Sequence, residues 1–255
     1  MRTETRYQRQ LAFSGIGPAG QERLARARAT VIGVGALGTA IANSLARAGF
    51  GFIRLVDPDR VEESNLQRQM LFDEDDAAAG VLKAEAAAAR LQRVNSGVSI
   101  EPIAARADAS NIDALVGDVD VTLDGTDNFE ARYLVNDACA RLGRPWVYGG
   151  VLADSGVSMN IVPGGPCLRC LIPEPPPAGS FATPETAGVL NQITAIIGSI
   201  EAVEAMKIVL GSPDVRRSLL SISLWDAQFN AIDVQRNPEC PTCGRLEHPF
   251  ILFPT

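Results

Sequence analysis

A glycine-rich turn between a predicted strand and a predicted helix constrains the fold of this chain most. An apolar run at 30–34 leads into Gly33, Gly35 and Gly38, and residues 36–49 have the apolar spacing of a helix packed on that strand. A second apolar run at 52–57 ends in an acid, Asp57. In this order the elements predict a βαβ unit whose helix N-terminus faces a phosphate. A glycine-rich connection that binds nothing would have the same local pattern.

The first half of the chain continues this alternation. Strands are expected at 99–103, 119–124 and 145–149, and helices at 77–94 and 129–142. Alternating strands and helices are typical of a parallel sheet with helices on both faces. We therefore predict an α/β fold with a Rossmann-like, mostly parallel sheet.

The pattern changes after about residue 150. Residues 151–162 read as extended, the proline-rich stretch 173–179 cannot lie inside a helix, a helix is expected at 193–210, and two short strands are expected within 218–235. The C-terminal third is thus predicted to be partly antiparallel. We expect a single domain over 1–255, with a nucleotide-binding half at 1–150 and a second part at 151–255.

Charge and hydropathy exclude several classes of partner. The formal net charge of −7 argues against nucleic acid, since binding a phosphate backbone takes a clustered Lys/Arg face. The first ten residues, MRTETRYQRQ, hold no apolar segment resembling a secretion signal, so we expect a cytoplasmic protein. Glu201, Glu204 and Lys207 interrupt the most apolar run, which argues against a membrane span.

Polar residues gather after the predicted strands at 52–57 and 119–124. The first group comprises Asp57, Asp59, Ser64, Asn65, Gln67, Arg68 and Gln69, and the second comprises Asp124, Asp127 and Asn128. The carboxyl ends of parallel strands meet at one edge of a sheet, so both groups are expected beside the glycine turn. Arg68 and the later Lys83 suit a polyphosphate, although either one alone would ordinarily be a solvated surface charge.

Asp127 has two interpretations. A carboxylate beside a polyphosphate is repelled unless a cation lies between them, which favours Asp127 as a ligand of Mg²⁺. Alternatively, Asp127 or Asn128 caps the helix predicted at 129–142, and capping does not exclude metal binding.

Four of the five cysteines form two Cys-x-x-Cys pairs, Cys167 with Cys170 and Cys240 with Cys243. Two such pairs can supply four thiolates to a tetrahedral Zn²⁺. With no open coordination position, this zinc is expected to be structural and to clip the C-terminal segment to the middle of the chain. A redox dithiol is the alternative. The fifth, Cys139, lies within a predicted helix and is expected to be a buried, structural thiol.

Taken together, these motifs resemble the bacterial ubiquitin-activating-like adenylyltransferases of the MoeB/ThiF/HesA family. The resemblance runs over nearly the whole chain. It includes Arg6-Tyr7-Gln8-Arg9-Gln10, the glycine turn with Ala36, the segments at 57–69 and 124–128, Lys83, both cysteine pairs, Ala187-Gly188-Val189 and Gly198-Ser199.

The resemblance implies adenylation, by ATP and Mg²⁺, of the C-terminal glycine carboxylate of a ubiquitin-like sulfur carrier protein that ends in Gly-Gly. By the same resemblance, the second part of the chain binds the carrier. Asp57 would hold the ribose, Asn65, Arg68 and Lys83 the phosphates, and Asp127 the metal. Arg9 would reach the triphosphate from the partner subunit of a homodimer, which makes the catalytic set Arg9, Arg68, Lys83 and Asp127.

Two positions depart from the family pattern. Many members carry a cysteine in the loop before Ala187-Gly188, whereas Pro184 stands near that place here. We therefore expect an enzyme that stops at the acyl adenylate, without a thioester, and leaves sulfur delivery to a donor protein or to sulfide. Ala36 replaces a frequent glycine, which is tolerable if its φ is negative.

Three other functions remain open from the sequence. The chain could adenylate the C-terminus of a short peptide, or it could be a nucleotide-binding partner without turnover. A nicotinamide dehydrogenase would also use the glycine turn, but it leaves the polar segments at 57–69 and 124–128 unexplained.

Overall fold

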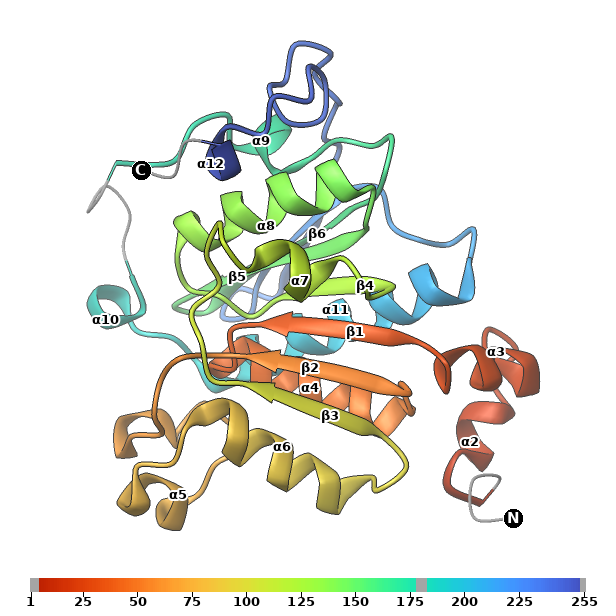
Figure 1. Cartoon of the computed structure of the whole chain (residues 1–255), viewed down its shortest axis with the longest axis vertical. Helices are drawn as coiled ribbons and strands as arrows, with labels where there is room; N and C mark the ends of the chain where they lie inside the picture. The colour runs from red at the N-terminus through yellow and green to blue at the C-terminus, as the bar shows by residue number, and fades with distance from the viewer. Residues whose placement is uncertain (1–4, 178–182, 253–255) are drawn as a thin grey trace.

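One eight-stranded sheet organises the computed structural model, which describes residues 5–177 and 183–252 (Figure 1). The strand order is β3-β2-β1-β4-β5-β6-β7-β8. Strands β1 to β5 pair in parallel, and β5 to β8 pair antiparallel. The strands are β1 (Arg28–Ile32), β2 (Phe52–Val56), β3 (Ser99–Ile103), β4 (Val121–Asp124), β5 (Trp146–Leu152), β6 (Ser155–Ile161), β7 (Leu219–Ser223) and β8 (Gln228–Ile232). The predicted α/β fold with a partly antiparallel C-terminal third is confirmed.

Helices cover both faces of the sheet (Figure 1). On one face lie α4 (Ala36–Ala48), α6 (Lys83–Val94) and α11 (Asn191–Leu210); on the other lie α7 (Ile112–Val116) and α8 (Phe129–Leu142). Shorter helices are α2 (Gln8–Leu11), α3 (Gly17–Leu24), η1 (Glu63–Asn65), α5 (Glu74–Ala79), α9 (Leu168–Leu171), α10 (Pro184–Ala187) and α12 (Pro249–Leu252). The proposed boundary at residue 150 stays a prediction; the same sheet crosses it.

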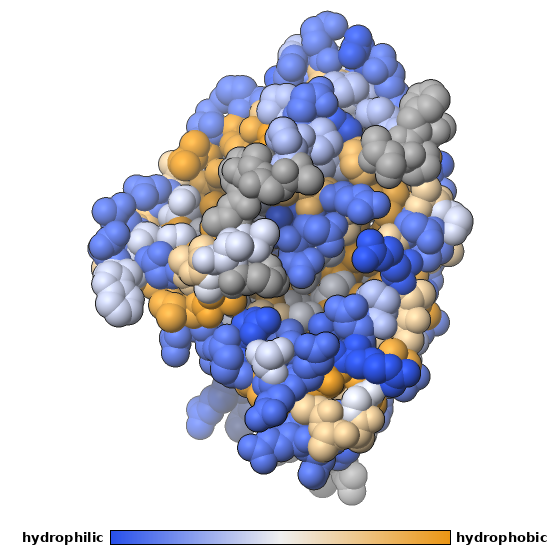
Figure 2. All heavy atoms as spheres, turned by 90° about the vertical axis from the view of Figure 1, so that its left-hand side faces the viewer, coloured by the Kyte–Doolittle hydropathy of each residue, from blue (hydrophilic) through white to orange (hydrophobic). Residues whose placement is uncertain are grey.

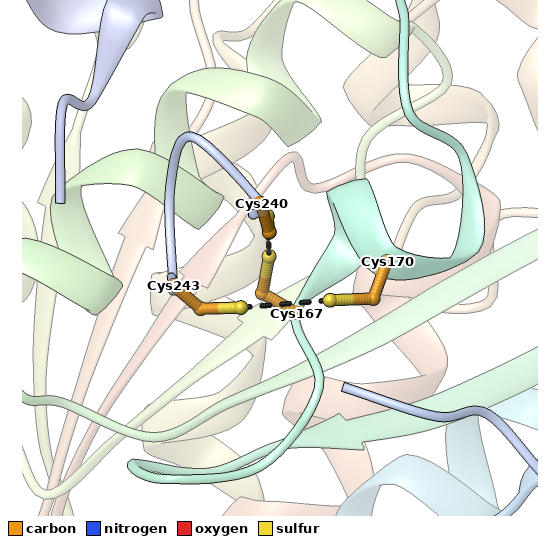
Figure 3. A group of neighbouring side chains, drawn as sticks. All are labelled: Cys167, Cys170, Cys240 and Cys243. Atoms are coloured by element: carbon orange, nitrogen blue, oxygen red, sulfur yellow. Dashed lines mark hydrogen bonds between the residues drawn. The ribbon is translucent and has the colours of Figure 1, made fainter. Parts of the chain in front are cut away.

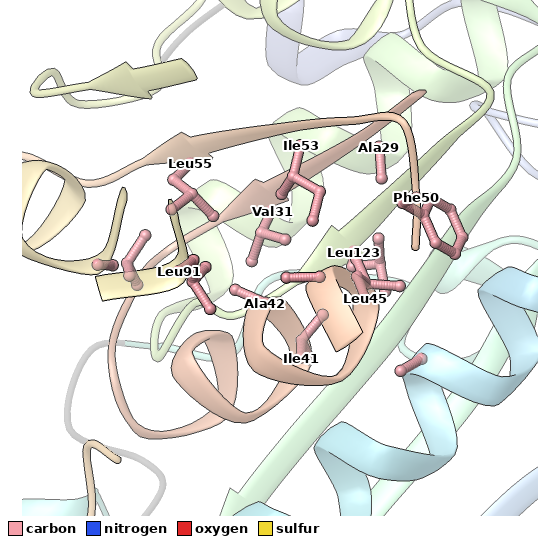
Figure 4. Close-up of a cluster of buried hydrophobic side chains, with 14 of the residues drawn as sticks. Ala29, Val31, Ile41, Ala42, Leu45, Phe50, Ile53, Leu55, Leu91 and Leu123 are labelled. Atoms are coloured by element: carbon pink, nitrogen blue, oxygen red, sulfur yellow. The ribbon is translucent and has the colours of Figure 1, made fainter. Parts of the chain in front are cut away.

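Two hydrophobic cores result from the alternation of side chains along the strands. Val31 of β1 packs with Leu55 of β2 and Ile41 of α4 (Figure 4), whereas the next residue, Ile32, belongs to the core under α7 and α8. Both faces of the central strands are therefore apolar, which explains their unbroken hydrophobic runs. This burial holds the carboxyl ends of the strands in fixed positions.

The single helix predicted at 77–94 is wrong. The chain forms two helices, α5 and α6, and Gly80 between them has φ +56°. Gly80 ends α5 in the left-handed conformation that favours glycine, and Asp73 begins that helix by accepting the N–H of Asp76 at 3.1 Å. The alanine-rich composition hid this break, because helix propensity is high on both sides of Gly80.

The strand order places a switch point between β1 and β4. From β1 the chain crosses to β2 and β3 on one side, and it then returns to β4 on the other. Connections leave these two strands in opposite directions, so a crevice forms at their carboxyl ends, where ligands of α/β sheets bind. These ends face left in Figure 1.

Among the described residues, no helix has both the length and the apolar character needed to cross a bilayer.

Candidate active site

The glycine turn packs directly against the loop that follows β4. Gly33 has φ +87°, and a Cβ there would overlap the backbone of Gly125. A Cβ on Gly38 would overlap the Gly33 carbonyl in turn. These three glycines therefore let the β1 turn, the first turn of α4 and the β4 loop come together without side chains between them.

The first turn of α4 presents free backbone donors at this edge. Gly35 is the N-cap residue of α4, and it has no side chain that could accept a hydrogen bond from the first N–H groups of the helix. The first N–H groups of α4 are thus left for a ligand, and the helix dipole favours an anion there. Ala36 is the first helical residue, consistent with the negative φ that its substitution for glycine requires. Gln69 lies over the turn, and its buried Oε1 has no hydrogen-bond partner in the part of the chain that the structure describes.

Asp57 holds the turn in shape. Its carboxylate accepts the N–H of Val34 at 2.7 Å and the N–H of Asp59 at 2.8 Å. Burial raises the pKa of Asp57, while these two N–H groups favour the charged form. The acid at the end of β2 therefore links the glycine turn to the polar segment that follows, and its place beside a ribose stays a prediction.

The segment after β2 brings several predicted residues to the same edge. Lys83, at the start of α6, is buried and forms an ion pair with Asp59 at 3.0 Å. Arg68 donates to the Ser64 carbonyl at 2.8 Å. Asn65 is buried and accepts the Glu62 N–H at 3.2 Å. Ser64 and Gln67 are exposed. Figure 2 looks onto this edge of the sheet, where hydrophilic residues surround a hollow near the middle of the face.

The loop after β4 divides its acids between two roles. Asp124 is buried, accepts Arg132 Nε at 3.0 Å and also accepts the N–H and hydroxyl of Thr126. Asp127 is exposed. Asn128 caps α8 by accepting the Ala131 N–H at 2.9 Å, so the capping interpretation is confirmed for Asn128. Asn128 also donates its Nδ2 to Asp127 Oδ1 at 3.2 Å. The contact of Asn128 with a nucleotide and the role of Asp127 as a metal ligand stay predictions.

Arg9 lies apart from the other predicted residues of its own chain. It is exposed on α2, which lies at the amino ends of the strands, opposite the glycine turn (Figure 1). Its neighbours in the motif anchor the helix: the Tyr7 hydroxyl accepts Asn95 Nδ2 at 2.8 Å, and Gln10 donates to the Ala48 carbonyl at 2.8 Å. A role for Arg9 in a nucleotide site therefore requires a second copy of the chain.

The four paired cysteines converge, although 69 residues separate Cys170 from Cys240 in the chain (Figure 3). Their Sγ atoms all lie within 4.8 Å of one another, and the distances Cys167–Cys240 and Cys170–Cys243 are 3.5 Å. Four sulfurs about 2.3 Å from a central ion lie about 3.8 Å apart in a tetrahedron. The cluster could hold zinc. Burial and the neighbouring sulfurs raise the pKa of Cys167, so they disfavour its thiolate. A bound cation would offset this effect by stabilising the thiolate.

Cys139 is inaccessible. It is fully buried in α8, and this burial raises the pKa of its thiol to about 12. The sequence-based expectation that Cys139 is buried is confirmed, and burial disfavours the thiolate that would act as a nucleophile. The side chain of Pro184 lies outside the described residues, so the comparison with a loop cysteine stays a prediction from the sequence.

A second hollow lies at the carboxyl edge, in the antiparallel part of the sheet. Its volume is about 450 Å³, and it is lined by Ala153, Asp154, Ala187, Gly188, Val189, Leu190, Trp225 and Asp226. Val189 pairs with Ala153 in a short parallel bridge, and Trp225, in the turn between β7 and β8, is 82% exposed. The lining of this hollow offers backbone groups of residues 187–190, the exposed indole of Trp225 and the acids Asp154 and Asp226. Such a lining suits an extended peptide segment as ligand.

Two residues of this edge escaped the sequence analysis. Arg132 binds Asp124, and Gly125 makes room for the glycine turn. A signal for Arg132 was present, because it lies one turn after the cap residue Asn128 among residues of α8 that are otherwise mostly apolar and buried. Gly125 carried no such signal, since its necessity depends on a contact with a distant segment.

A doubly wound sheet with a glycine turn and an open helix N-terminus at its switch point is the architecture of the α/β proteins that bind nucleotides. The model of the ThiF family matches residues 7–242, and the chain belongs to this family. It is 42% identical over 240 residues to the SAMP-activating enzyme E1 of Haloferax volcanii, covering 94% of this chain and 88% of that one. It is 39% identical over 251 residues to the sulfur carrier protein ThiS adenylyltransferase of Bacillus subtilis, covering 97% and 74%.

A solved structure shares the fold. The crystal structure of Escherichia coli MccB with ATP matches with a TM-score of 0.81 and 26% identity, over 94% of this chain and 74% of that one.

The sulfur carrier protein adenylyltransferase of Thermus thermophilus is 41% identical over 246 residues, covering 94% of this chain and 90% of that one. The expectation of an adenylyltransferase of the MoeB/ThiF type is therefore confirmed at the level of the family.

Proposed function

We propose that this enzyme adenylates the C-terminal glycine carboxylate of a ubiquitin-like sulfur carrier protein. The carboxylate attacks the α-phosphorus of ATP, the bond to the β-phosphate oxygen breaks, and pyrophosphate leaves. The topology supports the proposal: β1, β2 and β4 are neighbouring parallel strands, and their carboxyl ends lead into the open N-terminus of α4, the segment with Arg68 that pairs with Lys83 through Asp59, and the loop with Asp127. The relatives named as adenylyltransferases support it.

The reaction needs charge neutralisation more than proton transfer. A C-terminal carboxylate is already ionised at pH 7, so no general base is required. The N–H groups of α4, Arg68 and Lys83 offset the charge of the phosphate oxygens, and Asp57 holds the ribose. Mg²⁺ bound at Asp127 would neutralise part of the polyphosphate charge. The single histidine, His248, is buried beside the C-terminal helix, away from this edge.

The hollow beside Trp225 receives the tail of the carrier. An extended Gly-Gly segment has two flat faces and free backbone groups, which match the backbone of residues 187–190 and the exposed indole. The hollow lies on the same sheet edge as the nucleotide residues, so a tail entering there points toward the α-phosphate.

A homodimer completes the site. Arg9 cannot reach the switch point of its own chain, and exposed Phe13 and Met70 offer apolar contacts near α2 and near the polar segment after β2. A partner's α2 docked against the polar segment would bring its Arg9 to the triphosphate. Zinc bound by the four cysteines fixes the segment after β8 to α9, away from the reacting atoms.

ATP–pyrophosphate exchange tests this function. The panel contains ubiquitin-like carriers ending in Gly-Gly and short peptides, since the solved neighbours include MccB in complex with N-formylated MccA. We expect exchange with a carrier, and loss of exchange in Asp127→Ala, Arg68→Ala and Lys83→Ala. Exchange with peptides alone would replace the carrier by a peptide substrate, and wild-type exchange in all three variants would refute the site.

A further inference from the structure

A buried acid without a well-formed hydrogen bond lies beneath the nucleotide edge. Glu201 of α11 is fully buried, and among the described residues neither carboxyl oxygen has a partner at normal hydrogen-bond geometry, although the Asp124 N–H lies toward it. Leaving a buried carboxylate unpaired is costly, so such a group persists as the neutral acid or serves a purpose. Glu204, one helical turn further, shows the contrast: it binds Asn160, Lys207 and the Arg216 N–H.

Glu201 lies where β4 and β5 separate. The two strands pair at Thr122–Trp146 and at Leu123–Val147, and their pairing ends there. We call the residues just beyond, 124–126 and 148–149, the β4–β5 fork. A Cβ on Gly149 would overlap the Glu201 carboxyl, so Gly149 leaves the space in which this carboxyl sits.

Arg132 holds the same fork from the opposite face of the sheet. Its guanidinium donates to Asp124 at 3.0 Å, to the Thr126 carbonyl at 2.9 Å and to the Gly149 carbonyl at 3.2 Å. One cation thus ties the end of β5 to the loop that continues into Asp127. Asp124 is the acid that Arg132 binds directly, and Asp127 lies within its electrostatic reach. Glu201 approaches Gly149 from the other face of the sheet and feels the Arg132 charge without binding it.

Glu201 is placed to influence Arg132 through charge, because both side chains approach Gly149 from opposite faces of the sheet. Burial and the Asp124 charge raise the pKa of Glu201 well above its ordinary value, while Arg132, the Asp124 N–H and Arg216 favour ionisation. From β5, the buried Tyr148 faces the same cluster, and its pKa is also raised by burial. An ionised Glu201 would compete with Asp124 for Arg132 and add negative charge beneath a polyphosphate site.

We propose that Glu201 is a positioning residue of the nucleotide site. As a neutral acid beneath the fork, it leaves Arg132 to Asp124 and Thr126 and so fixes the loop that carries Asp127. This inference rests on the proposed binding of ATP at this edge. It extends that proposal, because it assigns a role to a residue that touches neither nucleotide nor carrier.

The test compares wild type with Glu201→Gln, which keeps the shape and cannot ionise. Binding of ATP with Mg²⁺ is measured by calorimetry from about pH 5 to about pH 9, the range over which buried glutamates titrate. ATP binding itself changes with pH in both proteins, so the measured quantity is the ratio of the wild-type Kd to the Kd of Glu201→Gln. We expect this ratio to rise about tenfold toward alkaline pH, because only the wild type can ionise at position 201. Glu204→Gln is the matched control on the same helix, and it should keep the wild-type pH profile.

A second pair of variants separates positioning from folding. Gly149→Ala should displace the Glu201 carboxyl and weaken ATP binding about tenfold. The same change in a Glu201→Ala background should cost little, since the overlap with Glu201 is then removed and only the end of the Leu37 side chain, 3.0 Å away, must shift. Thermal unfolding checks that each variant folds. Identical pH profiles for wild type and Glu201→Gln would overturn the inference while leaving the proposed function intact. Failure of the wild type to bind ATP at any pH would overturn both.

Discussion

Lys83→Met separates the contribution of this lysine to stability from its contribution to catalysis. The Lys83–Asp59 pair has an N–O distance of 3.0 Å, with the lysine side chain 10% and the aspartate side chain 65% exposed. Coulomb's law at this distance gives about 1 kcal/mol in water and about 5 kcal/mol at an effective dielectric constant of about 20. Because Asp59 is mostly solvated, the net contribution of the pair to the free energy of unfolding should be at most about 1 kcal/mol.

Methionine keeps most of the apolar stem of lysine, so packing around α6 should persist. We therefore expect Tm to fall by only about 2–4 °C. Losing a cation that stabilises charge in the transition state typically costs about 10²–10³ in rate, and exchange of pyrophosphate should fall by that factor. Differential scanning calorimetry and ATP–pyrophosphate exchange with a Gly-Gly carrier measure the two quantities.

Arg90→Met is the control on the same helix. Arg90 pairs with Asp73 in a partly exposed contact on the surface of α6. This variant should lose a similar amount of stability and keep its exchange rate. The reasoning would be refuted if Lys83→Met exchanged pyrophosphate within about threefold of wild type, or if its Tm fell by more than about 10 °C.

Three further predictions concern the cysteines, acid stability and the partner surface. Wild type should contain one zinc per chain, and Cys240→Ser should lose it with a lower Tm; wild type purified without metal would contradict this. Arg54 and Arg28 lower the pKa of Asp118 to about 2, so its stabilising contribution is present above about pH 4 and is lost as the pH falls toward 2. Asp118→Asn should therefore lose less stability over that interval in acid unfolding curves, and equal losses would count against the pairing. Binding of a Gly-Gly peptide should shift the fluorescence of the exposed Trp225, and an unchanged spectrum during productive exchange would place the tail elsewhere.

Local sequence predicted the elements that build the nucleotide edge. The run before Gly33, the helical spacing of 36–49 and the cap at Gly49 depend on neighbouring residues, and they match β1, α4 and its left-handed end. Asp57 was identifiable because an acid at the end of the second strand has a defined place in a βαβ unit. The break at Gly80 was missed, since alanines on both sides gave the segment a continuous helical propensity.

Spacing alone also indicated a possible zinc site, because two Cys-x-x-Cys pairs can supply four thiolates to one tetrahedral ion. The meeting of these pairs in space depended on the antiparallel turn of β5 to β8, which brings the segment after β8 back to α9 (Figure 3).

The order of residues by itself determined the fold class, the glycine turn and the kinds of side chain at the site, because each follows from local propensity and hydrophobic periodicity. Only the tertiary structure decided which groups share a cation. Arg132 of α8 binds Asp124 of β4, and Glu201 of α11 approaches the same strand ends from the opposite face, so this arrangement depends on how two helices pack across one pair of strands. Packing over such sequence separations has no local signature, so the charge balance beneath the site could be read only from the folded chain.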